Sequence, residues 1–204
     1  MMKLRFSPTS PYTRKVMVTA IETGLDGKIE RVPTNPWDPE SDIDQDNPLG
    51  KVPALILENG RPLFDSPVIC EYLDSLHQGA PLIPKNGQER WDVLCLEALA
   101  DGLMDAAVLV FLEKNRREAA ARSQWWLDVQ METIGRSIRE LERRAGDFSA
   151  NTDLAQISIG CALGYLDFRI PDSEWRHHAP TLERWYRRFS TRNSMQKTVP
   201  LDPA

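Results

Sequence analysis

The spacing of apolar and polar residues changes near residue 79 and divides the chain into two parts. Before this point, short apolar runs alternate with turn residues, as in strands joined by helices. Beyond it, apolar residues recur at steps of three and four, as on one face of an amphipathic helix. The linker, residues 79–87, holds two prolines and two glycines, which interrupt helices and strands alike. The pattern predicts one domain over residues 1–78 and an all-helical domain over residues 88–204.

The first part of the chain has the pattern of a small mixed α/β domain. Residues 3–6 and 29–32 are predicted strands on either side of a helix that ends near Gly24, which makes a βαβ unit. Residues 54–57 and 62–64 are a predicted hairpin, because an Asn-Gly pair in its turn supplies the positive φ that a tight turn needs. We therefore expect a four-stranded mixed sheet with helices on its faces.

The next predicted helix opens with Ser66 as N-cap and Pro67 at its first position, and runs to about His77. Residues 35–46 precede the hairpin and are expected to form a loop rich in proline and acid. Three aspartates at its end resemble the opening of a calcium loop, but the required glycine and glutamate are missing. Calcium binding is therefore not expected there.

Three helices dominate the prediction for the second part. A stripe from Trp91 to Val110 and a second from Leu127 to Leu141 should belong to two antiparallel helices. Residues 153–167 are apolar almost all round, which predicts a buried central helix, with Asp153 and Gln156 forming a capping box. A last helix is expected to place Leu182, Trp185, Tyr186 and Phe189 inward and Arg184, Arg187, Arg188 and Arg192 mostly outward.

Composition narrows the classes of function. The formal net charge of −5 opposes nucleic-acid binding, which favours basic surfaces. The chain starts without an apolar signal core and holds no run of about 18 apolar residues, so neither secretion nor a membrane partner is expected. Cys70, Cys95 and Cys161 each lie in an apolar helical pattern and are expected to be buried thiols in a reducing cytoplasm.

The stretch from Asn47 to Ser66 carries the first indications of a ligand site. Pro53 stands at the start of a strand, where its missing N–H is tolerated only if no strand partner needs it. A cis bond before Pro53 would leave the backbone of Val52 free to pair with an extended peptide, although most X–Pro bonds are trans. Asp65 and Ser66 fit either a helix cap or the binding of a ligand carboxylate by free N–H groups.

The sequence Asn-Pro-Leu-Gly-Lys-Val-Pro-Ala-Leu, followed by Asp-Ser, resembles the glutathione-binding half of the cytosolic glutathione S-transferases. The resemblance covers the whole chain and implies a thioredoxin-like domain followed by an all-α bundle. It implies that Val52 pairs its backbone with the cysteinyl part of glutathione. Asp65, where many members have Glu, would hold the γ-glutamyl ammonium, and Ser66 the γ-glutamyl carboxylate. Lys51 either pairs with the glycyl carboxylate or is a solvated loop residue.

The junction between the first strand and the first helix offers amide N–H groups and a positive dipole end. Its Ser10-Pro11-Tyr12 resembles the Cys-Pro-Tyr of glutaredoxins and omega-like transferases, with serine in place of cysteine. A serine forms no mixed disulfide but can donate a hydrogen bond to a thiolate. The local sequence also fits Ser10 as a plain N-cap. Thr9, Ser7 and Tyr12 are alternative hydroxyl donors.

The resemblance implies a homodimeric glutathione transferase of the bacterial-like serine type, active in detoxification. It would add the glutathione thiolate to a small electrophile, with glutathione as co-substrate and no metal or other cofactor. The electrophile pocket is expected between the domains, lined by Tyr12 and apolar side chains within 103–111. Trp37 is a second candidate, with simple packing favoured, and Arg14 and Lys15 are assigned to the helix surface.

Two other hypotheses about the function stay open. One is a transferase-fold binding or regulatory protein without catalysis, like stringent starvation proteins or the transferase-like domain of an elongation factor. The other is a glutathione-dependent lyase, dehalogenase or reductase. Retention of the Val-Pro and Asp-Ser motifs favours a working glutathione site, and the lack of a cysteine at position 10 disfavours a reductase.

Overall fold

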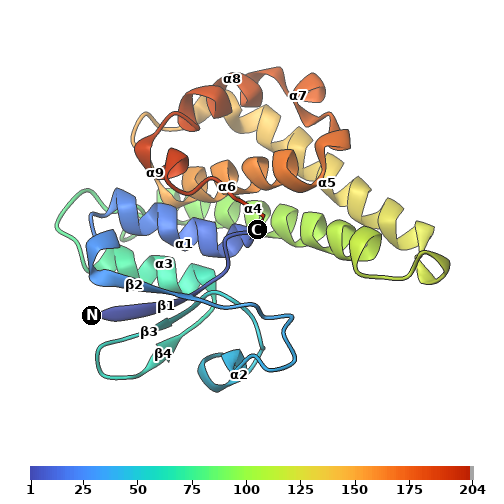
Figure 1. Ribbon diagram of the computed structural model, residues 1–204. Coiled ribbons are helices and arrows are strands. Elements are labelled where there is room, and N and C mark those ends of the chain that lie inside the picture. The colour runs from blue at the N-terminus through green and yellow to red at the C-terminus, as the bar shows by residue number, and fades with distance from the viewer. Residues whose placement is uncertain (203–204) are drawn as a thin grey trace.

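A four-stranded mixed sheet underlies the N-terminal domain of the computed structural model, which describes residues 1–202 (Figure 1). Its strand order is β2-β1-β3-β4. The inner strand β1 (Met2–Phe6) runs parallel to β2 (Ile29–Pro33) and antiparallel to β3 (Ala54–Ile56), which in turn pairs antiparallel with β4 (Pro62–Leu63). The predicted mixed sheet is thus confirmed.

Two helices, α1 (Pro11–Glu22) and α3 (Ser66–Ser75), lie side by side on one face of the sheet (Figure 1). The predicted N-cap of α3 is wrong by one residue. Asp65 is the cap, because its carbonyl accepts the first helical hydrogen bond from the N–H of Ile69 at 3.0 Å, and Ser66 is already helical. The helix also ends at Ser75 and not near His77.

The acidic segment before the hairpin is not a loop throughout. A short helix, α2 (Ile43–Asp46), forms at its end. Ile43 is 3% exposed and packs with Val52 and Ala54 in a small separate cluster, so the apolar residue in this polar segment explains why a turn of helix forms there. The predicted loop over 35–46 is wrong for this part.

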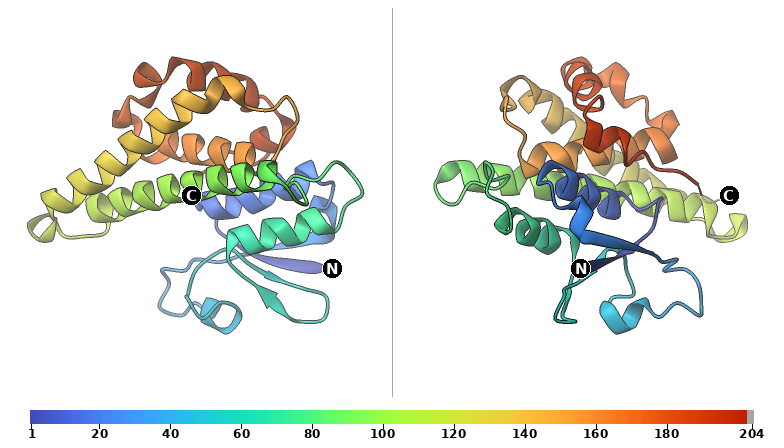
Figure 2. Two further views of the ribbon diagram at one scale, coloured as in Figure 1. Left: turned by 180° about the vertical axis from the view of Figure 1, so that it is seen from behind. Right: turned by 60° about the vertical axis from the view of Figure 1, so that its left-hand side comes forward.

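The C-terminal domain is helical, as predicted. Figure 2 shows α4 (Gln88–Asn115) and α5 (Gln124–Arg144) as a long antiparallel pair that extends away from the sheet. The central helix α6 (Leu154–Arg169) is buried from its first residue to Leu166. The remaining helices are α7 (Trp175–His178), α8 (Pro180–Phe189) and α9 (Asn193–Gln196), with 3₁₀ turns at 26–28, 119–121, 145–147 and 171–173. No helix within residues 1–202 is long and apolar enough to cross a membrane.

Half of the predicted capping box is present at α6. The Asp153 carboxylate accepts a hydrogen bond from the N–H of Gln156 at 2.8 Å. The Gln156 amide does not return to Asp153 but donates to the carbonyls of Ser149 and Asn151. The Gln156 side chain therefore binds the loop before α6 and is not available to complete the capping box.

The buried face of α4 is rotated from the predicted stripe. Trp91 is 60% exposed and Cys95 is also exposed, so these two predictions are wrong, whereas Cys70 and Cys161 are buried as expected. Glu97 takes part in the buried face, because it pairs with a lysine of α1. Apolar spacing alone could not show that this turn of the helix buries a carboxylate. The inward residues of α8 are buried as predicted, and they are Leu182, Trp185, Tyr186 and Phe189.

Candidate functional site

Strand register brings three separate segments to one edge of the sheet. Arg5 near the end of β1 lies opposite Ala54 at the start of β3, so Val52 reaches the edge from which the chain leaves β1. Leu63 at the end of β4 pairs with Leu55, which brings the start of α3 to the same edge. The first turns of α1 and α3, and the loop before β3, therefore lie together there (Figure 1).

Ser10 is the N-cap of α1. Its Oγ accepts a hydrogen bond from the N–H of Thr13 at 3.2 Å, and Pro11 occupies the first helical position. This contact uses a lone pair of the hydroxyl oxygen and leaves the O–H free to donate. The plain cap and the thiolate donor are thus compatible roles for one side chain, in a place where the helix N-terminus favours negative charge.

The three alternative hydroxyl donors, Ser7, Thr9 and Tyr12, each have a hydrogen-bond partner within the protein. Ser7 and Thr9 lie with their oxygens 3.3 Å apart, within hydrogen-bond distance of each other. The Tyr12 hydroxyl donates to Asp105 of α4. Burial and this carboxylate raise the pKa of Tyr12 well above its ordinary range, so Tyr12 keeps its proton and directs it to Asp105. Among the four hydroxyls, Ser10 is the one placed at the start of the helix with a free O–H.

The Val52–Pro53 bond is cis, and Val52 makes no backbone–backbone hydrogen bond within residues 1–202. The loop before it is fixed by Asn47, whose amide donates to the Lys51 carbonyl at 2.7 Å. Val52 thus offers an N–H and a C=O next to the strand β3. The Lys51 side chain is exposed and takes part in no ion pair with a described residue.

Asp65 and Ser66 differ in exposure at the start of α3. Asp65 is exposed and makes no capping contact through its side chain, whereas Ser66 is 2% exposed. The peptide bond between Phe64 and Asp65 is also cis. The Asp65 carboxylate therefore points its charge toward solvent beside the free N–H groups of the helix start.

A lysine that the sequence pattern assigns to the surface is buried behind the site. Lys15 is fully buried, with its ammonium 2.7 Å from the Asp101 carboxylate and 3.2 Å from Glu97, both on α4. Burial opposes its charge, but the neighbouring carboxylates raise the pKa of Lys15 overall. Burial likewise raises the pKa of Glu97 and of Asp101. The predicted surface position of Lys15 is wrong, because this ion cluster joins the two domains.

Arg14 is also buried, at 8% exposure, and its prediction as a surface residue is wrong too. Its guanidinium donates to the Met195 carbonyl at 3.2 Å, so it ties α1 to α9. For Lys15, a signal was available in the sequence, because acidic residues recur at positions 97, 101 and 105 on α4. Three carboxylates at steps of four on a mainly apolar helix need cations or a ligand opposite them.

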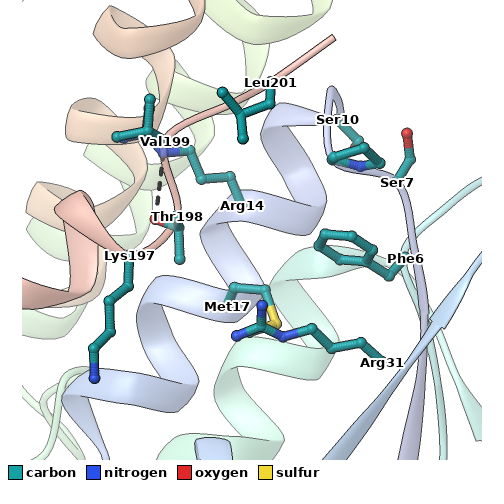
Figure 3. A pocket seen from close by; sticks show the side chains of 11 residues that line it. Phe6, Ser7, Ser10, Arg14, Met17, Arg31, Lys197, Thr198, Val199 and Leu201 are labelled. Atoms are coloured by element: carbon teal, nitrogen blue, oxygen red, sulfur yellow. Dashed lines mark hydrogen bonds between the residues drawn. The ribbon is translucent and has the colours of Figure 1, made fainter. Parts of the chain in front are cut away.

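A cavity of about 160 Å³ opens beside the Ser10 segment (Figure 3). Ser7 and Ser10 line one side, and the chain from Lys197 to Leu201 lines the other. Arg14, Arg31 and Lys197 contribute positive charge, and no acidic residue lines it. The C-terminal segment that forms this wall carried no recognisable pattern in the sequence.

The residues expected to line an electrophile pocket differ in how far they are buried. Leu103 is fully buried, so it belongs to the core, whereas Phe111 is half-buried and Tyr12 reaches α4 through Asp105. Trp37 is 57% exposed, which contradicts the packing role expected for it, and the Arg116 guanidinium lies 5.8 Å from its ring centre.

No group of three or more His, Cys, Asp or Glu side chains in residues 1–202 is arranged to hold a metal ion. The adjacent histidines His177 and His178 are exposed.

Comparison with known proteins gives consistent matches over the whole chain. Residues 9–76 match a family model described as the glutathione S-transferase N-terminal domain, and residues 117–188 match the corresponding C-terminal domain. An Escherichia coli relative, the uncharacterized GST-like protein YibF, is 39% identical over 98% of both chains.

Solved structures agree in fold. A glutathione transferase family member from Pseudomonas fluorescens Pf-5 with bound glutathione is 47% identical, with a TM-score of 0.95 over 99% of this chain and 100% of the other. A second structure from that bacterium contains S-(propanoic acid)-glutathione and matches at 46% identity and a TM-score of 0.91, covering 98% of this chain and 100% of the other. A glutathione S-transferase from Methylobacillus flagellatus KT with glutathione bound is 38% identical, with a TM-score of 0.93 over 98% and 100% of the two chains.

Proposed function

Because the chain belongs to the glutathione S-transferase family, we propose that it binds glutathione and transfers its thiolate to a small electrophile. The observation that carries this proposal is the meeting of Ser10, Val52 and Ser66 at one edge of the sheet. Relatives that contain bound glutathione share this fold over nearly all of their length.

In this proposal Ser10 stabilises the thiolate. A free thiol with a pKa near 8.5 is only a few per cent ionised at about pH 7, and the thiolate is the nucleophile. A hydroxyl donor and the start of α1 both favour the anion, and each pKa unit corresponds to about 1.4 kcal/mol. Because the Ser10 oxygen accepts a hydrogen bond from the N–H of Thr13, its position is fixed before the ligand arrives.

The remaining contacts would position the tripeptide. We assign the cysteinyl backbone to Val52, the γ-glutamyl ammonium to Asp65 and the γ-glutamyl carboxylate to Ser66. Lys51 would approach the glycyl carboxylate from its exposed loop. Within this proposal the glutathione-binding domain spans residues 1–78, and the helical domain that starts at residue 88 forms the other wall of the site.

Calorimetric titration with reduced glutathione tests the site. The wild type should bind at millimolar glutathione or below, and Ser66→Ala should weaken binding about tenfold, because a buried hydroxyl at a charged ligand is lost. Ser75→Ala is the matched control at the other end of α3, where the hydroxyl donates to the Tyr72 carbonyl. Absence of binding to the wild type would contradict the enzyme proposal and favour a regulatory protein.

A homodimer is part of the proposal. Val68 on α3 is 48% exposed and Trp91 on α4 is 60% exposed, and the exposed Cys95 lies one turn further along α4. The Arg90–Glu71 ion pair at 2.8 Å holds the two helices together at this place. An exposed apolar face on two adjacent helices is the kind of surface that a second copy covers. We also propose a cytoplasmic location. The Cys95 thiol is exposed, and an exposed free thiol is typical of a protein in a reducing compartment.

A further inference from the structure

A guanidinium next to the proposed site is held by the chain's own C-terminal segment. Arg169 is the last residue of α6, and its two terminal nitrogens lie 2.5 and 3.2 Å from the two carboxylate oxygens of Asp202. The Arg169 side chain is 14% exposed, whereas that of Asp202 is 63% exposed. The pair therefore joins a fixed cation to a carboxylate on the surface.

Aromatic rings fix the position of this cation. The Arg169 guanidinium lies 3.8 Å from the ring centre of Phe168 and 4.5 Å from that of Phe111 on α4. Its Nε is buried and has no hydrogen-bond partner within residues 1–202. Stacking on rings leaves the forked edge of a guanidinium available for a planar carboxylate. Asp202 is the carboxylate partner of Arg169 in the part of the chain that the structure describes.

The tail connects this guanidinium to the Ser10 cavity. Leu201 lines the cavity beside Ser10 (Figure 3), and the next residue along the chain, Asp202, reaches Arg169. Consecutive Cα atoms are about 3.8 Å apart, so the position of the Asp202 carboxylate is a short distance from the cavity. A ligand that extends from the proposed thiolate past Leu201 would meet Arg169.

A buried phenol lies on the same face of α6 as Arg169. Tyr165 is one turn before Arg169, and its ring centre lies 6.5 Å from that of Phe168. Tyr165 is 5% exposed, and burial raises the pKa of Tyr165 to about 12, against the influence of the Arg169 charge. The surroundings of the Arg169 guanidinium are therefore mainly aromatic side chains of α4 and α6.

We propose that Arg169 binds a carboxylate on the second substrate and that Asp202 occupies this position while the site is empty. The proposal rests on the proposed glutathione transfer and names its substrate class as small electrophiles that carry a carboxylate. The incoming carboxylate replaces one of the same charge and shape, so Arg169 never loses an ionic partner. The Asp202 side chain is 63% exposed, so its carboxylate can move into solvent and be replaced by that of the ligand.

Two matched glutathione conjugates test this assignment by calorimetry without any turnover. Their added group is a propanoic acid in one and the corresponding propanamide in the other, so they differ only in charge. In Arg169→Gln we expect the affinity ratio of acid to amide to fall about tenfold, because a charge-assisted bidentate contact is lost. Glutathione itself should bind as in the wild type.

Two further variants, one in the C-terminal segment and one at a surface arginine, complete the experiment. Asp202→Asn should tighten binding of the acid conjugate about threefold and leave the amide unchanged, because the competing carboxylate is removed. Arg187→Gln is the control, since Arg187 pairs with Glu183 on an exposed face of α8. Melting curves of each variant verify folding, and Asp202→Asn changes only an exposed side chain.

The outcomes separate the two proposals. An unchanged acid-to-amide ratio in Arg169→Gln with normal glutathione binding overturns the carboxylate assignment alone. Weaker acid binding in Asp202→Asn would also overturn it, because Asp202 would then assist the ligand. Failure of the wild type to bind glutathione overturns the proposed function and this inference together.

Discussion

Ser10 caps α1, and we propose that the same side chain also stabilises the glutathione thiolate. We predict that Ser10→Ala raises the pKa of glutathione bound to the protein by about one unit or more, because the thiolate loses its hydroxyl donor. The pH dependence of thiolate absorbance measures this. The same change should lower the free energy of unfolding by about 0.5–2 kcal/mol through loss of the cap.

Ser123 separates these two effects. Its Oγ caps α5 by accepting from the N–H of Trp126 at 3.3 Å. Ser123→Ala should therefore cost a similar free energy of unfolding and leave the pKa of the bound thiol unchanged. An equal pKa rise in both variants would mean that Ser10 has no contact with the sulfur.

Among the substitutions proposed here, replacement of Lys15 should lower the free energy of unfolding the most. Lys15→Met leaves Glu97 and Asp101 buried without a cation, and we expect the free energy of unfolding near pH 7.5 to fall by about 3–5 kcal/mol. Lys114→Met, at an exposed position of α4, should change it by less than about 0.5 kcal/mol. Denaturant titration of the variants provides the comparison.

The loss in Lys15→Met should depend on pH. Burial raises the pKa of both carboxyls in the folded protein, so the folded state binds protons that the unfolded state has released. Proton binding by these two carboxyls stabilises the folded state. This stabilisation is fully present below the ordinary carboxyl range near pH 4, and it is lost as the pH rises through the pKa values of Glu97 and Asp101 in the folded protein. The variant should recover part of its stability at about pH 5, and a loss that is equal at both pH values would contradict the burial argument.

At the scale of elements, α6 depends on Gly160 for its close packing against α8. A Cβ at Gly160 would lie 2.7 Å from the Phe189 ring of α8, closer than atoms in contact can approach. Gly160→Ala should therefore lower the free energy of unfolding by about 1–3 kcal/mol, although alanine favours helix. Gly102→Ala on α4 meets nothing within 4 Å and should stabilise the protein by up to about 1 kcal/mol. Thermal melting of both variants would show changes of opposite sign.

Sequence periodicity predicted the elements well where apolar residues alone account for their burial. The central helix is apolar almost all round, the two long helices and the sheet have apolar faces, and the approximate positions of all of them agree with the structure. It failed at α2, because four residues with one buried isoleucine make no period. It also failed for the rotation of α4, whose buried face includes the carboxylate of Glu97. Local pattern cannot show which charges find partners on a distant element.

At the scale of the whole molecule, the exposed face of α3 and α4 predicts self-association. If the proposed homodimer forms through this face, Trp91→Arg should convert it to a monomer, because a charge would be buried between copies. Trp125→Arg is the matched control, since Trp125 is 69% exposed on α5, away from this face. Sedimentation velocity measures both. A wild type that sediments as a monomer at about 10 μM would contradict the dimer, since stable dimers of this kind associate below that concentration.

The family and fold of the whole chain could be predicted because short motifs mark the glutathione-binding half. The comparisons confirm this prediction. The ion pairs between distant parts of the chain could not be predicted in the same way. Lys15 and Arg169 are single charged residues whose partners lie 82 to 86 and 33 positions away. Their roles depend on tertiary structure, which a local pattern does not contain.

The Lys15 cluster also limits how this chain can be recombined with relatives. A chimera that joins this N-terminal half to a helical half without carboxylates at positions 97 and 101 would bury a lone ammonium at the junction. The reciprocal chimera would bury two carboxylates. Functional exchange of halves should therefore succeed only between parents that share this trio of charges, so the two halves are expected to evolve as a matched pair.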